Sequence, residues 1–188
     1  MGGLLLGLLL LAAAPEGKAA APCPRQPLPH AVDSIGPPPV NHAFNMIEFS
    51  AKPSLGRSAW VVRITQETPK GAAMVEAVRL TVRMDCNLYD DDGRITGILS
   101  PEQFARFAAI IEPFVRPPLG SLPLREPRGP WESPVDGTAI VLRLTTREWQ
   151  VTRHRNAAEK EGRAIFEAVD HFLIENAPAA RMKNFLPN

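Results

Sequence analysis

The chain's two cysteines and four histidines are the side chains best suited to nucleophilic or metal chemistry. A thiol nucleophile at Cys86, assisted by Asp85 or His154, would need an exposed thiolate, and an inward position at the end of an apolar strand opposes that. If the chain is exported, a disulfide between Cys23 and Cys86 is the simpler expectation. No two histidines have zinc spacing, so we expect neither a metal nor a cofactor.

A run of three aspartates and a glycine at 90–93 is the next polar cluster. It resembles part of an EF-hand loop, but Leu88 and Leu99 occupy positions where that loop requires oxygen ligands. We therefore expect a solvated turn at 91–93. A looser calcium site that adds Asp85 and Asn87 is the alternative.

Arginines recur at the outward positions of the expected strands, and a guanidinium binds carboxylate and phosphate groups with two hydrogen bonds. If the strands are neighbours, these residues form one basic patch for an anionic ligand: Arg63, Arg79, Arg83, Arg143 and, at its margin, Arg153. The alternative is a solvated face on which the arginines pair with Glu76, Glu148 or Asp85.

The segment 117–137 is rich in proline and long for a loop inside one domain, and such loops tend to be functional or disordered. Trp131 follows Pro130 within it, and a large aromatic on a stiff loop is a typical interface anchor. Arg128 lies in a P-x-x-P pattern in the same loop. The alternative is that Trp131 folds back over the protein's own core.

Several enzyme classes are excluded by their motifs. The sequence has no G-x-S-x-G, S-x-x-K, H-E-x-x-H, P-loop or G-x-G-x-x-G pattern. The common serine hydrolases, penicillin-binding enzymes, zinc proteases and nucleotide binders all depend on one of these. Enzymes outside these classes remain open.

The elements that would position these groups follow from hydrophobic periodicity. Alternation of apolar and polar residues predicts strands over 42–52, 59–66 and 75–86, a short one over 94–99, and a long strand or hairpin over 138–152. Alternation of this kind is typical of an antiparallel sheet with one buried face.

Two helices are predicted. Ser100 and Gln103 form a capping box with Pro101 at the first helical position, and we expect Pro113 and the prolines at 117–118 to end that helix. Asn156 is expected to cap the last helix, which stops before Pro178. The fold class is therefore α+β: an antiparallel sheet of about five to six strands with two helices on one face, in the order strands, helix, strands, helix.

The N-terminus predicts export. Residues 1–14 form an apolar run of signal-peptide length, too short to span a membrane, although no basic residue precedes it. We expect a signal peptide over 1–21, a proline-rich arm over 22–40 and a single α+β domain over 41–188 with the loop at 117–137. The alternative is an N-terminal core helix.

The composition of the chain limits the classes of function that it can have. The 188 residues carry 21 Lys+Arg against 20 Asp+Glu, too even a balance for a nucleic-acid binder. With 45% hydrophobic residues the chain can form a core. We expect a periplasmic or secreted protein with no membrane span after cleavage, which binds a protein or an anionic envelope component without catalysis, in an inhibitor, immunity or envelope-accessory role. The alternative is a small secreted hydrolase or thiol enzyme.

Overall fold

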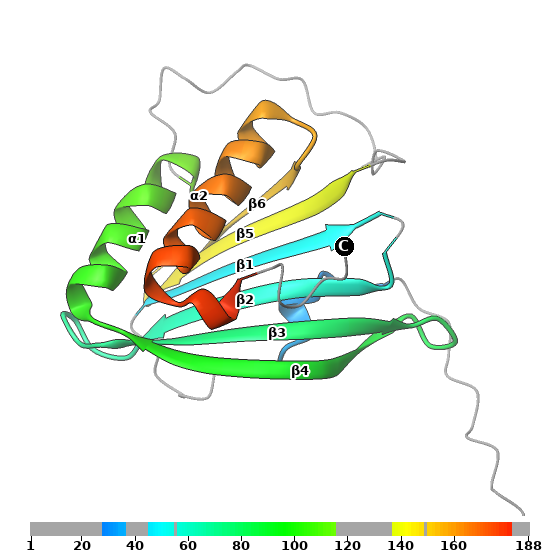
Figure 1. The fold of residues 1–188 in the computed structure, drawn as a ribbon, viewed down its shortest axis with the longest axis horizontal. Helices are drawn as coiled ribbons and strands as arrows, with labels where there is room; N and C mark the ends of the chain where they lie inside the picture. Colours follow the sequence, from blue (N-terminus) through cyan, green and yellow to red (C-terminus); the bar gives the residue numbers. More distant parts are fainter. Residues whose placement is uncertain (1–27, 37–44, 55, 116–136, 149, 182–188) are drawn as a thin grey trace, which may run out of the picture.

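The protein folds around one six-stranded antiparallel sheet (Figure 1). The computed structural model describes residues 28–36, 45–54, 56–115, 137–148 and 150–181. Its strands are β1 (Asn45–Pro53), β2 (Ser58–Gln66), β3 (Ala73–Arg83), β4 (Leu88–Leu99), β5 (Thr138–Thr146) and β6 (Gln150–Asn156). The same residues also form two α-helices, α1 (Pro101–Val115) and α2 (Lys160–Asn176), and the short 3-10 helices η1 (Ala31–Asp33) and η3 (Pro178–Ala180).

The strands lie in the order β4-β3-β2-β1-β5-β6. The first four form a meander, and the hairpin of β5 and β6 then pairs with the free side of β1. The chain thus runs four strands, helix, two strands, helix, which confirms the predicted α+β class and the predicted element order. The stretch predicted as one long strand or a hairpin over 138–152 is a hairpin.

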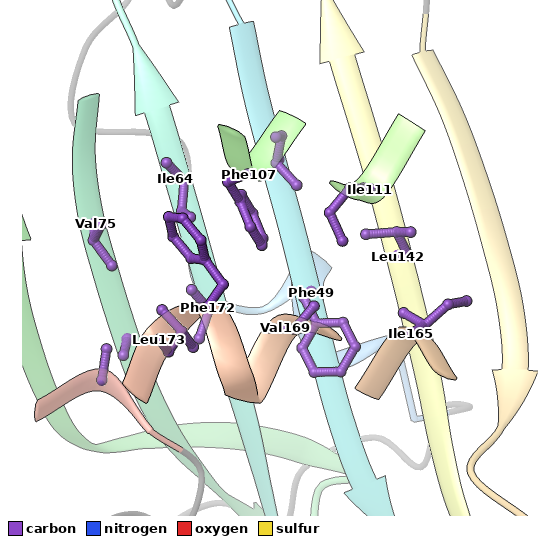
Figure 2. Packing of buried hydrophobic residues seen from close by; sticks show 14 of the residues in the cluster. Phe49, Ile64, Val75, Phe107, Ile111, Leu142, Ile165, Val169, Phe172 and Leu173 are labelled. Atoms are coloured by element: carbon purple, nitrogen blue, oxygen red, sulfur yellow. The ribbon is translucent and has the colours of Figure 1, made fainter. Parts of the chain in front are cut away.

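Both α-helices pack on one face of the sheet, which we call the helix face (Figures 1 and 2). Phe49, Trp60 and Ile64 point from the strands into this core. Phe107 of α1 and Phe172 of α2 meet over them, with ring centroids 4.5 Å apart. Each fully buried side chain of this size contributes about 1.5–3 kcal/mol to folding, so this core holds the helices on the sheet.

The helix termini agree only partly with the sequence. Gln103 N donates to Ser100 Oγ at 3.2 Å and Ser100 N donates to Gln103 Oε1 at 2.7 Å, which is the predicted capping box. Pro113, expected to stop α1, lies inside it, and the helix continues to Val115. Pro113 removes the one intrahelical hydrogen bond that its N–H would have donated to the carbonyl of Ala109, and α1 ends two residues later.

Asn156 does not cap the last helix, although the sequence predicted that it would. It is the last residue of β6, and its Oδ1 accepts a hydrogen bond from Ala158 N at 2.8 Å. The helix α2 begins four residues later, at Lys160, and ends at Asn176 before Pro178 as expected. Asn156 therefore orders the turn that leads into the helix.

The turn between β3 and β4 also differs from the prediction. The chain reverses at 84–87, with Asn87 in the left-handed region at a φ of 51°, a conformation that Asn tolerates better than most residues. The run at 90–93 is consequently part of β4, with a register shift opposite Arg79 and Leu80. The prediction of a turn at 91–93 was wrong.

A second hydrophobic cluster covers the opposite face of the sheet. Residues 28–36, which we call the N-terminal strap, cross this face and bury Ala31, Val32 and Ile35. They pack against Ala59, Val61, Val78, Leu80 and Val141 of the strands. We call this side the strap face. Part of the proline-rich arm predicted over 22–40 is thus packed onto the domain.

None of the helices in the described part of the chain is long and apolar enough to cross a membrane.

Candidate functional site

A row of alternating charges crosses the strap face. Arg143 of β5, Glu48 of β1, Arg63 of β2 and Glu76 of β3 lie opposite one another in register on four adjacent strands. Arg143 Nη1 lies 3.3 Å from Glu48 Oε2, and Arg63 Nη2 lies 2.9 Å from Glu48 Oε1. Arg94 of β4 pairs with the far oxygen of Glu76. We call these five residues the ion-pair row.

The centre of the ion-pair row is buried. Arg63 is 3% exposed and Glu48 1%. Arg63 Nη2 also donates to the carbonyl of Gly36 at 2.7 Å, so the strap closes over it. Arg63 Nη1 and Glu76 Oε2 lie 3.7 Å apart, and each lacks a hydrogen bond. A buried guanidinium already engaged by carboxylates and a backbone carbonyl is a structural group, because an incoming anion would have to displace them.

Two polar contacts fix the strap at the β5–β6 side. Arg143 Nη2 donates to Asp33 Oδ1 at 2.5 Å. The ring of His30 lies against that of His154 on β6, with centroids 4.6 Å apart. Burial lowers the pKa of His154, and the nearby His30, Arg143 and Arg155 lower it further, while Asp33 opposes them. The neutral form of His154 is therefore the one that suits this contact.

The predicted arginine patch divides into two groups. Arg63 and Arg143 lie together in the ion-pair row, whereas Arg79 is opposite Trp60 and so belongs to the helix face. Arg79 Nε pairs with Asp92 at 2.9 Å. Arg83, at the end of β3, pairs with Asp85 at 3.2 Å, and the hydrogen bond from Arg83 lowers the pKa of that carboxyl. The pairing of arginines with Glu76 and Asp85, the alternative open from the sequence, is present for Arg63 and Arg83.

Cys86 lies in the turn after β3 and is fully buried. Arg83 Nη2 is 3.1 Å from its sulfur. Cys23 falls outside the described residues. His154 is on β6 and Cys86 is beside β4, at opposite edges of the sheet. The structure thus separates the histidine from the thiol that it would have to activate.

Trp131 and Arg128 also fall outside the described residues, but both stems of their loop are described. The carbonyl of Val115, where α1 ends, accepts a hydrogen bond from Arg153 Nη2 of β6 at 3.0 Å. Ser54, after β1, donates its N–H to the Gly137 carbonyl at 2.8 Å and accepts from Gly137 N through Oγ at 3.2 Å. Both ends of 116–136 are therefore tied to the sheet.

A shallow groove of about 450 Å³ lies between the turn after β2 and the start of α1. Its described lining residues are Gln66, Lys70, Pro101, Glu102, Phe104 and Ala105. The amide of Gln66 already bonds Asn45 and Gly71, and Ser100 holds the carboxylate of Glu102. The groove thus presents no pair of groups arranged for acid–base work.

In the described ranges, no three or more His, Cys, Asp or Glu side chains are arranged to hold a metal ion. The aspartates of β4 pair instead with Arg79, Arg83 and Arg94.

Three structurally important residues were not singled out from the sequence: Glu48, Asp33 and His30. Glu48 did carry a signal, because it interrupts an apolar strand between Ile47 and Phe49 and a buried carboxylate requires a partner. His30 and Asp33 carried none, because only the path of the strap brings them to β5 and β6.

Comparison with known proteins adds no assignment: no protein-family model, no curated protein and no solved structure matches this chain.

Proposed function

We propose that this chain is an exported, non-enzymatic domain that binds a protein or an anionic component of the cell envelope. The contact residues are Trp131 and Arg128 of the loop, with the accessible arginines Arg79 and Arg83 as a second point of contact. The location that goes with this proposal is the periplasm or the extracellular medium.

The attachment of the loop stems is the observation that carries the proposal. Arg153 fixes the chain at Val115, and Ser54 fixes it at Gly137. Gly137 also lies so close to the Asn156 amide that a Cβ there would come within 2.5 Å of Oδ1. A long loop on rigid stems is the usual way in which a stable scaffold presents binding residues. The Trp131 segment has such a base.

Fewer of the predicted arginines are available to bind a ligand than the sequence suggested. Arg63 and Arg143 serve the ion-pair row, so neither is a good candidate for gripping a ligand. The side chains of Arg79 and Arg83 are 37% and 44% exposed, but an anion would compete there with Asp92, Asp85 and Asp90. Exposed ion pairs of this kind contribute little free energy, so Arg79 and Arg83 can exchange these aspartates for acidic groups of a ligand at little cost.

Affinity capture from an envelope extract tests the proposal, with mature protein beginning near Ala20 as bait. We expect Trp131→Ala together with Arg128→Ala to lose the partners that the wild type retains, while the melting temperature stays unchanged. Arg79→Ala with Arg83→Ala measures the second point of contact. Arg163→Ala, at an exposed position of α2, is the matched control. Identical capture by the wild type and both double variants would refute the proposal.

We also propose the Cys23–Cys86 disulfide, which would tether the segment before the strap to the β3–β4 turn. The full burial of Cys86 supports this pairing over a reactive thiol. The crosslink is consistent with export, because disulfides persist in oxidising compartments.

The second candidate function is a small secreted hydrolase or a thiol enzyme built on Cys86. The 3.1 Å approach of Arg83 to the sulfur is the one observation that favours it, because a guanidinium stabilises a thiolate. Alkylation of the native protein with iodoacetamide distinguishes the two. Modification of Cys86 without denaturant would favour the enzyme; no modification, with an intact mass two hydrogen atoms below the reduced value, favours the disulfide.

A further inference from the structure

The strand β4 is the outermost strand on one side of the sheet, and among the described strands it pairs only with β3. It is twelve residues long, and most of its side chains are exposed. Figure 1 shows it along the margin of the sheet, opposite β6. An open edge of this length offers a row of backbone donors and acceptors to another strand.

The two halves of β4 differ in whether they carry features that prevent pairing with another strand. The first half carries Asp90, Asp91 and Asp92 and contains the register shift opposite Arg79. Charges and bulges of this kind are the devices by which proteins prevent edge pairing. The second half, 95–99, has the sequence Ile-Thr-Gly-Ile-Leu and carries no charge.

Large apolar side chains are exposed on this unprotected half. Ile98 is 78% exposed on the strap face, and Ile95 is 37% exposed on the helix face. Gly97 lies between them, and a Cβ at that position would have no atom within 4 Å. Its backbone is not in the left-handed region, so no turn explains the glycine. A glycine inside a strand often marks the close approach of another backbone or side chain.

We propose that two copies of this chain pair through the second half of β4, antiparallel, with the two-fold axis normal to the sheet at Thr96. The result is one continuous twelve-stranded sheet with the four α-helices on one face. About such an axis, a residue that precedes Thr96 by some number of positions lies opposite the residue that follows Thr96 by the same number in the other copy. The two side chains of each pair point to the same face of the sheet.

An axis at Thr96 fits the side chains on both faces. On the helix face, Ile95 lies opposite Gly97 of the partner subunit, and the isoleucine covers the space beside the glycine. On the strap face, Thr96 lies opposite itself, and Ile98 lies along the aliphatic stem of Arg94 of the partner subunit. Pairs of this kind are the unit of sheet stabilisation.

The distribution of charge favours a second copy in this register. In this register the three aspartates lie opposite 100–102 of the partner subunit, beyond the end of its strand, so none of them faces an apolar residue of that strand. Moving the axis one residue back, to Ile95, would place Asp92 opposite Ile98 of the partner subunit and bury a carboxylate against an apolar side chain. The paired stretch is short, so the interface belongs to the small, reversible class.

Sedimentation velocity of the mature chain over a concentration series tests the proposal. We expect reversible dimers for the wild type, and we expect Ile98→Lys to weaken association by about tenfold or more, because it introduces two ammonium groups close to Arg94 of each copy. The control is Ile110→Lys, which changes an isoleucine on α1 that is 40% exposed. A monomer at every concentration, or equal weakening by both substitutions, would overturn the proposal.

A second variant tests the register. Cα atoms directly across an antiparallel pair are about 4.5–5.5 Å apart, which a disulfide can bridge. Thr96→Cys is therefore expected to form a covalent dimer under mild oxidation, seen on a non-reducing gel, whereas Ile110→Cys is not. Failure of Thr96→Cys to crosslink would overturn the register. If the chain stays monomeric and Ile98→Lys instead loses a captured envelope protein, the edge serves a foreign strand and the self-pairing is refuted.

Discussion

Arg63 and Glu48 face each other in register on β2 and β1, and the guanidinium donates to one carboxylate oxygen from Nε at 3.0 Å and from Nη2 at 2.9 Å. Both side chains lie between the sheet and the N-terminal strap, out of contact with water. Burying two charges costs several kcal/mol for each ion, which their pairing and hydrogen bonds offset. Removing one partner leaves the other charge uncompensated.

The first prediction concerns this pair. Arg63→Leu should lower the free energy of unfolding by about 3 kcal/mol, because Glu48 stays buried with only Arg143 beside it. Arg79→Leu, which breaks a half-exposed ion pair with Asp92, should cost less than about 1 kcal/mol. Urea unfolding measures both. Adding Glu48→Leu to Arg63→Leu should recover part of the loss, and equal costs for the two single variants would contradict this account.

The second prediction concerns pH. Because the folded structure lowers the pKa of His154 below its ordinary value of 6.5, the unfolded chain binds a proton more readily than the folded one. Stability is therefore fully present above about pH 6.5 and is lost as the pH falls through the folded pKa. The strap contact between His30 and His154 should loosen first, seen as faster hydrogen exchange at 30–35 than in β2.

Two variants isolate this histidine. His154→Gln should flatten the fall of the melting temperature between pH 7.5 and 5.5, because the titrating group is gone. His171→Gln, at an exposed position on α2, should keep the wild-type slope. The same slope in all three proteins would show that other groups cause the pH dependence.

The third prediction concerns the junction of β6 and α2. A Cβ at Gly162 would lie 2.0 Å from the backbone oxygen of Asn156, so the helix can approach the strand end only through a glycine. Gly162→Ala should cost about 2 kcal/mol or more, because the atom that it meets belongs to the backbone and moves little. Gly93→Ala, where a Cβ would meet nothing within 4 Å, should change stability by about 0.5 kcal/mol or less. Thermal unfolding of the two variants gives the comparison.

The fourth prediction concerns the proposed disulfide. Cys23→Ser with Cys86→Ser should destabilise the mature chain by up to about 4 kcal/mol, because a crosslink over so long a loop restricts the unfolded chain strongly. Dithiothreitol should shift the wild type towards the double variant and leave the variant itself unchanged. A wild type that is insensitive to the reductant would exclude the crosslink.

Much of the architecture was predictable because it depends on local periodicity. The alternation around Trp60, Val62 and Ile64 predicted β2, and the stripe from Ile165 to Leu173 predicted α2. The capping box of Ser100 and Gln103 predicted that α1 begins at Pro101, which is where the helix begins. Each of these features depends on residues that are close together in the sequence, so the sequence pattern alone predicts it.

Local periodicity did not predict which face of the sheet each arginine would take. Arg63 and Arg79 occupy similar alternating positions in their own strands, yet they lie on opposite faces. Which face a residue takes depends on the register between β2 and β3, and a shift of one residue reverses every side chain. Their partners, including Glu48 and Asp92, follow from that register.

The sequence by itself determined the class of the fold, the order of the main elements and the apolar stripes that form the core, because each depends on a repeat of two or 3.6 residues. Only the tertiary structure decided that the strap covers the second face, that His30 meets His154, and that Arg63, Arg94 and Arg143 pair with carboxylates in a row across five strands. Those contacts join residues far apart in the chain, and no local pattern specifies the distance between them.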